Sequence, residues 1–175
     1  MICSSVQSQH CERGARNFIS LSDVIVSRCY TGHVELSDEI YARLLSIRTG
    51  MRLFERWSEQ QANAVGLTTA QHQLLLAVRG HDDPRGPTIG EVADYLLLRH
   101  HSTVGLIDRA ASAGLIKRTR DRDDHRIVRL ALSEDGARRL EELSALHVEE
   151  LRRLGAHFQA VSEGLTPTHN HGLSK

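Results

Sequence analysis

The amino-acid sequence predicts a mainly α-helical protein with one small antiparallel sheet of two or three strands. Between residues 36 and 163, apolar side chains recur mostly at spacings of three and four, the period of an α-helix. The period falls to two between Leu115 and Leu132, as in a pair of short strands. Hydrophobic residues make up 40% and charged residues 25% of the 175-residue chain, which is typical of a soluble globular domain. We expect a cytoplasmic protein with no membrane partner, because no apolar run is long enough to cross a bilayer.

The first helix is predicted over residues 36–64. Ser37 stands at its start as a candidate N-cap. Five apolar residues form one stripe along four turns of this helix: Ile40, Leu44, Ile47, Met51 and Phe54. Such a stripe suits either a hydrophobic core or a dimer contact, and both interpretations stay open on the sequence.

Two short helices follow, and each begins with a capping box, in which a threonine and the residue three positions later cap each other's backbone amides. Thr68 and Gln71 start a helix that ends at Gly80. Thr88 and Glu91 start the next, shorter helix. Two of the three prolines lie between these helices, which predicts a loop there.

A fourth helix is predicted over Arg99–Ala113. Leu115–Arg120 and Ile127–Leu132 then alternate as strands, and the residues between them are all charged or ionisable. Ser133 is placed to cap a long final helix over residues 133–163. A charged hairpin directly after two short helices is typical of a winged helix-turn-helix, here with a long helix on either side.

The predicted domain covers residues 35–165, with a winged-helix core at 67–132. Residues 1–34 form an N-terminal extension and residues 166–175 a polar tail, and both are expected to be poorly ordered.

All three cysteines, Cys3, Cys11 and Cys29, lie in this extension. Their odd number argues against a disulfide framework. Cys29 and His33 have the i, i+4 spacing of two metal ligands on one helix face, but an inert extension is the favoured interpretation.

The net charge of zero conceals a basic segment. Residues 85–129 carry nine Arg or Lys against six Asp or Glu, whereas the whole chain has 22 of each. A basic face indicates a polyanionic partner, and the Arg99–Ala113 helix is slim enough to enter the major groove of DNA. On the first strand, Arg118 and Arg120 are candidates for phosphate contacts. Five residues at the start of the helix are candidates for contacts with bases or phosphates: Arg99, His100, His101, Ser102 and Thr103.

Six motifs in this part of the chain, in this order and spacing, resemble the MarR family of transcriptional regulators. They are Leu67–Gln71, Thr88–Ala93, Ser102–Arg109, Ala113–Arg118, Asp121–Arg126 and Leu132–Gly136. The residues Asp124-His125-Arg126 match the Asp-x-Arg of this family. The resemblance implies that Arg126 enters the minor groove and that Asp124 orients it, and a narrow groove of negative potential does attract a guanidinium.

The resemblance also implies a homodimer, with residues 36–64 and 133–163 as the dimerisation helices and a pseudo-palindromic operator as the target. Members of the family often respond to a small molecule. Arg52, Trp57 and His72 are the candidate ligand contacts, although core packing or exposure to solvent is the simpler explanation for each.

The sequence therefore predicts a sequence-specific DNA-binding transcriptional regulator, a homodimeric repressor relieved by a small-molecule ligand. The alternatives are a winged-helix protein-interaction module without specific DNA binding, or a metal-responsive regulator. No catalytic motif is present, so we expect no enzyme activity, no cofactor and no resident metal.

Overall fold

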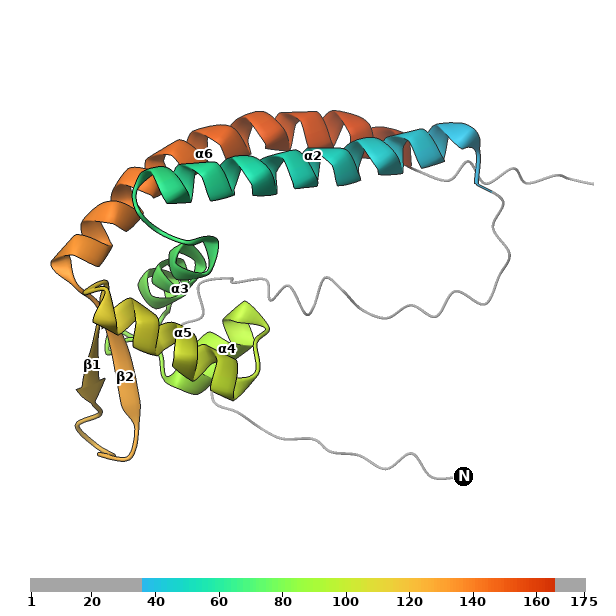
Figure 1. Cartoon of the computed structure of the whole chain (residues 1–175). Coiled ribbons are helices and arrows are strands. Elements are labelled where there is room, and N and C mark those ends of the chain that lie inside the picture. The colour runs from blue at the N-terminus through green and yellow to red at the C-terminus, as the bar shows by residue number, and fades with distance from the viewer. Residues whose placement is uncertain (1–35, 166–175) are drawn as a thin grey trace, which may run out of the picture. The chain divides into compact units, whose positions relative to one another are not determined.

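A computed structural model describes residues 36–165 (Figure 1). Predictions made for the N-terminal extension, including Cys3, Cys11, Cys29 and His33, and for the C-terminal tail lie outside the described residues. The elements follow one another as α2 (Asp38–Ala64), α3 (Thr69–Gly80), α4 (Ile89–Leu96), α5 (His100–Ser112), β1 (Ile116–Arg120), β2 (Val128–Leu132), α6 (Glu134–Ser162) and the 3-10 turn η1 (Glu163–Leu165). The mainly helical class with a small antiparallel sheet is confirmed.

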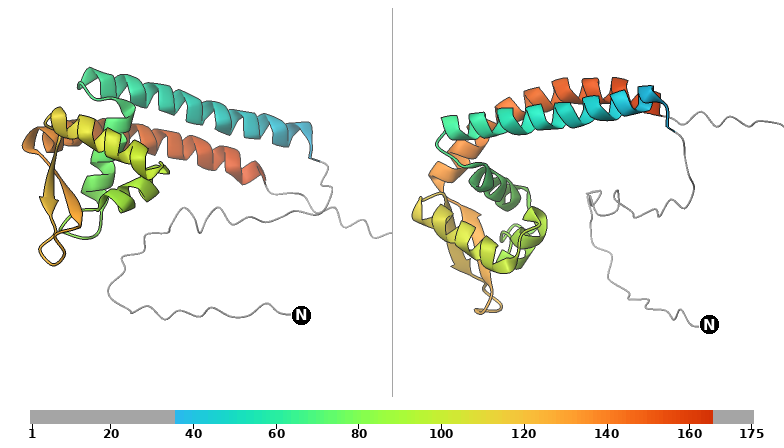
Figure 2. Two further views of the ribbon diagram at one scale, coloured as in Figure 1. Left: turned by 60° about the horizontal axis from the view of Figure 1, so that its bottom comes forward. Right: turned by 45° about the vertical axis from the view of Figure 1, so that its right-hand side comes forward.

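The two long helices, α2 and α6, run side by side in opposite directions (Figure 1). The Arg43 guanidinium near the start of α2 donates a hydrogen bond to the carbonyl of Val161 near the end of α6, at 3.4 Å. The remaining helices and the hairpin form a winged lobe, and the hairpin projects away from the α2–α6 pair (Figure 2). None of the helices within residues 36–165 is long and apolar enough to span a membrane.

Local capping explains where the helices begin. In the capping box of α3, the Thr68 hydroxyl accepts from the amide of Gln71 at 3.2 Å, and the Gln71 side chain accepts from the amide of Thr68 at 2.9 Å. The same exchange between Thr88 and Glu91 opens α4. Both predicted capping boxes are confirmed. Ser37 does occupy the N-cap position of α2, but its side chain makes no capping hydrogen bond.

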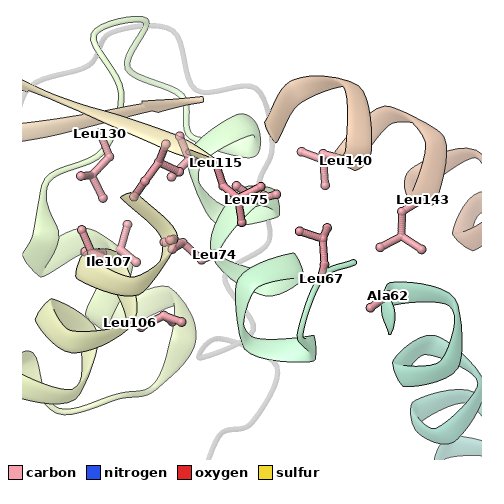
Figure 3. Packing of buried hydrophobic residues seen from close by; sticks show 14 residues of the cluster. Ala62, Leu67, Leu74, Leu75, Leu106, Ile107, Leu115, Leu130, Leu140 and Leu143 are labelled. Carbon is pink, nitrogen blue, oxygen red and sulfur yellow. The ribbon is translucent and has the colours of Figure 1, made fainter. Parts of the chain in front are cut away.

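One hydrophobic core serves both parts of the structure (Figure 3). Leu74 and Leu75 of α3 pack with Ile107 of α5 and with the hairpin. The same cluster continues to the long helices, where Leu67 lies close to Leu143 of α6 (Figure 3). The members of the cluster that belong to the two long helices are Ala62, Leu140 and Leu143. The winged lobe is therefore packed against α2 and α6 and is not merely tethered to them.

The hairpin contains two strands. They pair in antiparallel register from Ile116 opposite Leu132 to Arg120 opposite Val128. A single bridge between Thr88 and Arg129 adds the start of α4 to the outer side of β2, in the place where a third strand would lie. The hairpin is thereby joined to the loop between α3 and α4.

Candidate nucleic-acid interface

The first turn of α5 is exposed to solvent. Arg99 takes the N-cap position without making a capping hydrogen bond from its side chain, as expected, because a guanidinium cannot accept from backbone amides. The side chains of Arg99, His100, His101 and Ser102 are all exposed and lie next to one another on this turn. They are therefore free to contact a partner.

Thr103 is a correction to the sequence prediction, because it has no exposed surface. Its hydroxyl donates to the carbonyl of Arg99 at 3.2 Å, and its side chain lies on the buried face of α5. Thr103 precedes Leu106 and Ile107 by three and four residues, so the helical period already indicated this inward position. In this structure Thr103 helps to hold α5 in the lobe and cannot touch DNA.

The turn between α4 and α5 depends on an unusual residue. Leu97 adopts the left-handed conformation, with φ of 52° and ψ of 38°, and ends α4 there. Its side chain is 92% exposed. Leucine in this conformation is strained by its Cβ, and glycine is the residue that usually occupies such a position.

The tip of the wing presents Arg126. Its side chain is 93% exposed, and one carboxylate oxygen of Asp124 accepts from its backbone amide at 3.0 Å and from its Nε at 3.3 Å. The carboxylate thus orients the guanidinium while leaving it in solvent. This is the arrangement that the Asp-x-Arg resemblance implies.

The two arginines predicted on β1 differ in their surroundings. Arg118 forms an ion pair with Asp108 of α5, so its charge is already partly neutralised. Arg120 is exposed near the tip of the hairpin. Of these two predicted phosphate contacts, Arg120 has the more available charge.

A group of five charged residues at the base of the wing was not found from the sequence. Arg129 and Asp121 form a buried ion pair, with 9% and 4% of their surfaces exposed. Asp83 and Arg85, on the loop before α4, join this pair, and so does Asp123 of the wing. Residues far apart in the sequence make up the group, and no local pattern marks them.

These ion pairs keep the carboxylates charged. The hydrogen bond from the Arg129 guanidinium, together with backbone amides, lowers the pKa of Asp121 to about 2. Hydrogen bonds from Arg85 hold the pKa of Asp83 well below its usual range. The stability that Asp121 contributes is therefore present at neutral pH and is lost only as the pH falls from about 4 toward 2.

A cavity of about 690 Å³ lies between α2 and α6. Trp57, one of the three candidate ligand contacts, lies in its lining. The other two candidates do not line this cavity: Arg52 is exposed and His72 is buried elsewhere, which are the simpler explanations given for them above. The polar side chains of its lining are Ser46, Thr49, Glu150, Arg153 and His157.

His72 belongs instead to a cluster of rings at the contact between α3 and α6. The centroid of its ring lies 4.7 Å from that of His147, and the ring centroids of Trp57 and His147 lie 4.9 Å apart. The Nδ1 atom of His147 donates to the Leu143 carbonyl at 2.9 Å, so its Nε2 can accept from the Ser58 hydroxyl at 2.8 Å. Among residues 36–165 no three His, Cys, Asp or Glu side chains are placed to hold a metal ion.

Comparison with known families finds one match, which covers most of the winged lobe. Residues 65–127 match a family model described as the MarR family. This segment is similar to the MarR family. Within it, the model match runs from the end of α2 to the tip of the wing, and so includes α5 and Arg126.

A curated protein of Bacillus subtilis is similar to part of the chain. Over 71 residues the chain is 35% identical to YsmB, an uncharacterized HTH-type transcriptional regulator of Bacillus subtilis (strain 168). The alignment covers 41% of this chain and 49% of YsmB, so the chain spans about half the length of this curated relative.

Several solved structures share the fold, among them one of a MarR family regulator. AbsC of Streptomyces coelicolor superposes with a TM-score of 0.61 at 19% identity, covering 77% of this chain and 95% of AbsC. The MepR–DNA complex of S. aureus gives 0.55 at 20% identity, with coverage of 70% and 85%. A mutant of E. coli MarR complexed with operator DNA gives 0.55 at 24% identity, with coverage of 74% and 94%. These likenesses extend to the long helices and confirm the predicted winged fold with its two flanking helices.

Proposed function

We propose that this protein is a DNA-binding transcriptional regulator that acts as a homodimeric repressor. The observation that carries the proposal is the exposed Arg126, oriented by Asp124 on a wing that belongs to the same lobe as the exposed first turn of α5. A helix fits the major groove and an arginine suits the minor groove, so the two elements supply complementary ways of reading one site. The relatives named above are regulators, and two of the solved structures contain DNA.

The roles of the side chains follow from their chemistry. The imidazoles of His100 and His101 and the hydroxyl of Ser102 can donate to or accept from base edges, which makes them candidates for sequence reading. Arg99 and Arg120 present charge without fixed geometry and suit phosphates, which position the protein without specifying sequence.

A homodimer is the second part of the proposal. Eight apolar side chains of α2 and α6 are 41% to 64% exposed in the single chain: Tyr41, Leu44, Leu45, Met51, Leu53, Leu146, Val148 and Leu151. Soluble monomers rarely leave this many large apolar side chains open to water. We infer that the two long helices pack against those of a second copy, which would present two wings to a pseudo-palindromic operator.

Relief of repression by a small molecule is the third part. The cavity between α2 and α6 is large enough for such a ligand and has a mixed lining, with Trp57 and Leu154 beside the polar groups of Ser46 and His157. A molecule with an aromatic or aliphatic body and one or two polar substituents would match this lining.

The first experiment is a gel shift with purified protein and DNA from upstream of its own gene, with competitor DNA and a series of salt concentrations. We expect a specific complex that weakens by about 10³-fold or more between roughly 50 and 200 mM salt, because several phosphate contacts release counterions. Arg126→Ala should weaken binding by about 1–3 kcal/mol without changing the oligomeric state. Arg152→Ala, which removes the same charge from an exposed position on α6, is the matched control.

If no specific complex forms on this DNA, genome-wide selection of bound fragments follows. Failure to enrich any sequence there would overturn the proposal and favour a winged-helix module that binds another protein. Equal affinity of the Arg126→Ala and Arg152→Ala variants would refute the role of the wing.

A further inference from the structure

The five charged residues at the base of the wing form a continuous brace, defined here as Asp83, Arg85, Asp121, Asp123 and Arg129. It connects the loop between α3 and α4 to the hairpin. Since the loop is part of the packed lobe and the hairpin projects from it, the brace lies where the wing could otherwise bend.

Arg129 anchors the inner end of the brace. Its Nε donates to Asp121, and one terminal nitrogen lies 2.8 Å from the carbonyl of Gly86 and 3.2 Å from a carboxylate oxygen of Asp83. The backbone at Gly86 lies unusually close to that of Leu130 on β2. Gly86 has a φ of 85°, and a Cβ atom there would lie 2.0 Å from the carbonyl oxygen of Leu130. The backbone of the loop and that of β2 are thus in direct contact beside the ion pair.

Asp121 links this anchor to the tip of the wing. While one of its oxygens accepts from Arg129, the other accepts from the amides of Asp123 at 2.9 Å and Asp124 at 3.4 Å. Asp124 then holds the backbone and Nε of Arg126. An unbroken series of direct contacts therefore runs from the loop, through two buried side chains, to the exposed arginine.

Burying the ion pair of Asp121 and Arg129 is not the simplest way to stabilise a hairpin. Apolar residues of similar volume often serve as well, whereas an ion pair fixes two side chains in one geometry. The carboxylate of Asp121 also brings negative charge close to a surface that would approach DNA. A role in geometry accounts for both features.

We propose that Asp121 and Arg129 are positioning residues, which set the direction in which Arg126 leaves the wing. The expected effect on DNA binding rests on the proposed function, whereas the positioning of Arg126 rests on the contacts of the brace.

The test compares Asp121→Asn with Asp123→Asn. Both variants remove one negative charge from the wing, which by electrostatics alone would strengthen binding to DNA. In Asp121→Asn, however, the side chain has one acceptor oxygen where Asp121 uses two, so it cannot accept both from the Nε–H of Arg129 and from the backbone amides of Asp123 and Asp124, and the brace is interrupted. Asp123 has a side chain that is 86% exposed and makes only the outer contact with Arg85. We expect Asp121→Asn to weaken DNA binding about tenfold and Asp123→Asn to leave it unchanged or stronger.

A double variant distinguishes positioning from general stability. If Asp121 acts through Arg126, the loss from Asp121→Asn should largely disappear in an Arg126→Ala background. Fully additive losses, or equal affinities of the two Asp→Asn variants, would overturn the inference. Thermal unfolding of each variant checks that the binding assays use folded protein.

Limited trypsin digestion tests the brace without DNA. The bonds after Arg122 and Arg126 lie in the wing tip, and their cleavage rates can be followed by mass spectrometry. We expect faster cleavage in Asp121→Asn than in Asp123→Asn, and unchanged rates would overturn the inference. If the unaltered protein binds no DNA, the proposed function fails, and these rates still decide whether the brace holds the tip. If Asp121→Asn does not fold, Arg85→Gln takes its place, because Arg85 is half-exposed and belongs to the same brace. An unchanged cleavage rate in this variant would refute the inference.

Discussion

Protonation of His72 should weaken the contact between the winged lobe and the long helices. His72 is 6% exposed, and its ring packs against His147 of α6. Burial, followed by the charge of His147, lowers the pKa of His72 from 6.5 to about 4. The unfolded chain therefore takes up a proton at this site at a higher pH than the folded protein does.

The sign and size of the effect follow from this difference. Because the pKa is lower in the folded state, the free energy of unfolding falls as the pH drops from about 6.5 to 4. Between pH 7 and pH 5 this one site removes roughly 2 kcal/mol, and below pH 4 the full loss is about 3 kcal/mol.

Urea unfolding at pH 7 and pH 5, at a fixed protein concentration, measures the loss. Fluorescence of Trp57 is a suitable signal, because its ring lies beside His147 in the same cluster. In His72→Leu, the difference between the two pH values should shrink by roughly 2 kcal/mol. His100→Leu, at an exposed position, should keep the difference of the unaltered protein. If His72→Leu keeps that difference too, burial of His72 does not perturb its pKa and the reasoning is wrong.

Three further substitutions test other features. Leu97→Gly should raise the free energy of unfolding by about 0.5–1 kcal/mol, because relief of the left-handed leucine exceeds the added freedom of the unfolded chain; a thermal melt measures this. Gly136→Ala should cost about 3 kcal/mol or more in the same assay, since the new Cβ would lie 2.0 Å from the Leu115 carbonyl oxygen. Leu53→Asp, on the exposed face of α2, should shift the protein from dimer to monomer in light scattering. A dimer that persists would place the interface elsewhere.

Much of the fold could be predicted because its signals are local. Thr68 with Gln71 and Thr88 with Glu91 cap helices through contacts three residues apart, so the sequence displays them directly. The pairing of the exposed Arg126 with Asp124 could also be predicted, because the two residues are only two positions apart in the sequence.

The remaining features depend on tertiary contacts. Arg129 directly precedes the core-facing Leu130 on β2, so its side chain lies on the other face of the hairpin, where exposure to solvent is expected. It is buried only because the loop at Asp83 returns against it. The surroundings of His72 also depend on tertiary contacts. Its spacing from Leu75 and Val78 placed it on the buried face of α3, but only the fold shows that His147 of α6 covers it.

The shared core has a consequence for how the protein can be divided. Residues 67–132 include every element of the winged lobe, yet Leu67 shares one buried cluster with Ala62 of α2 and with Leu140 and Leu143 of α6. A fragment cut at these boundaries would open that side of its interior to water. The lobe is therefore not a transferable module. A shorter protein that keeps it folded must also keep the end of α2 and the first three turns of α6.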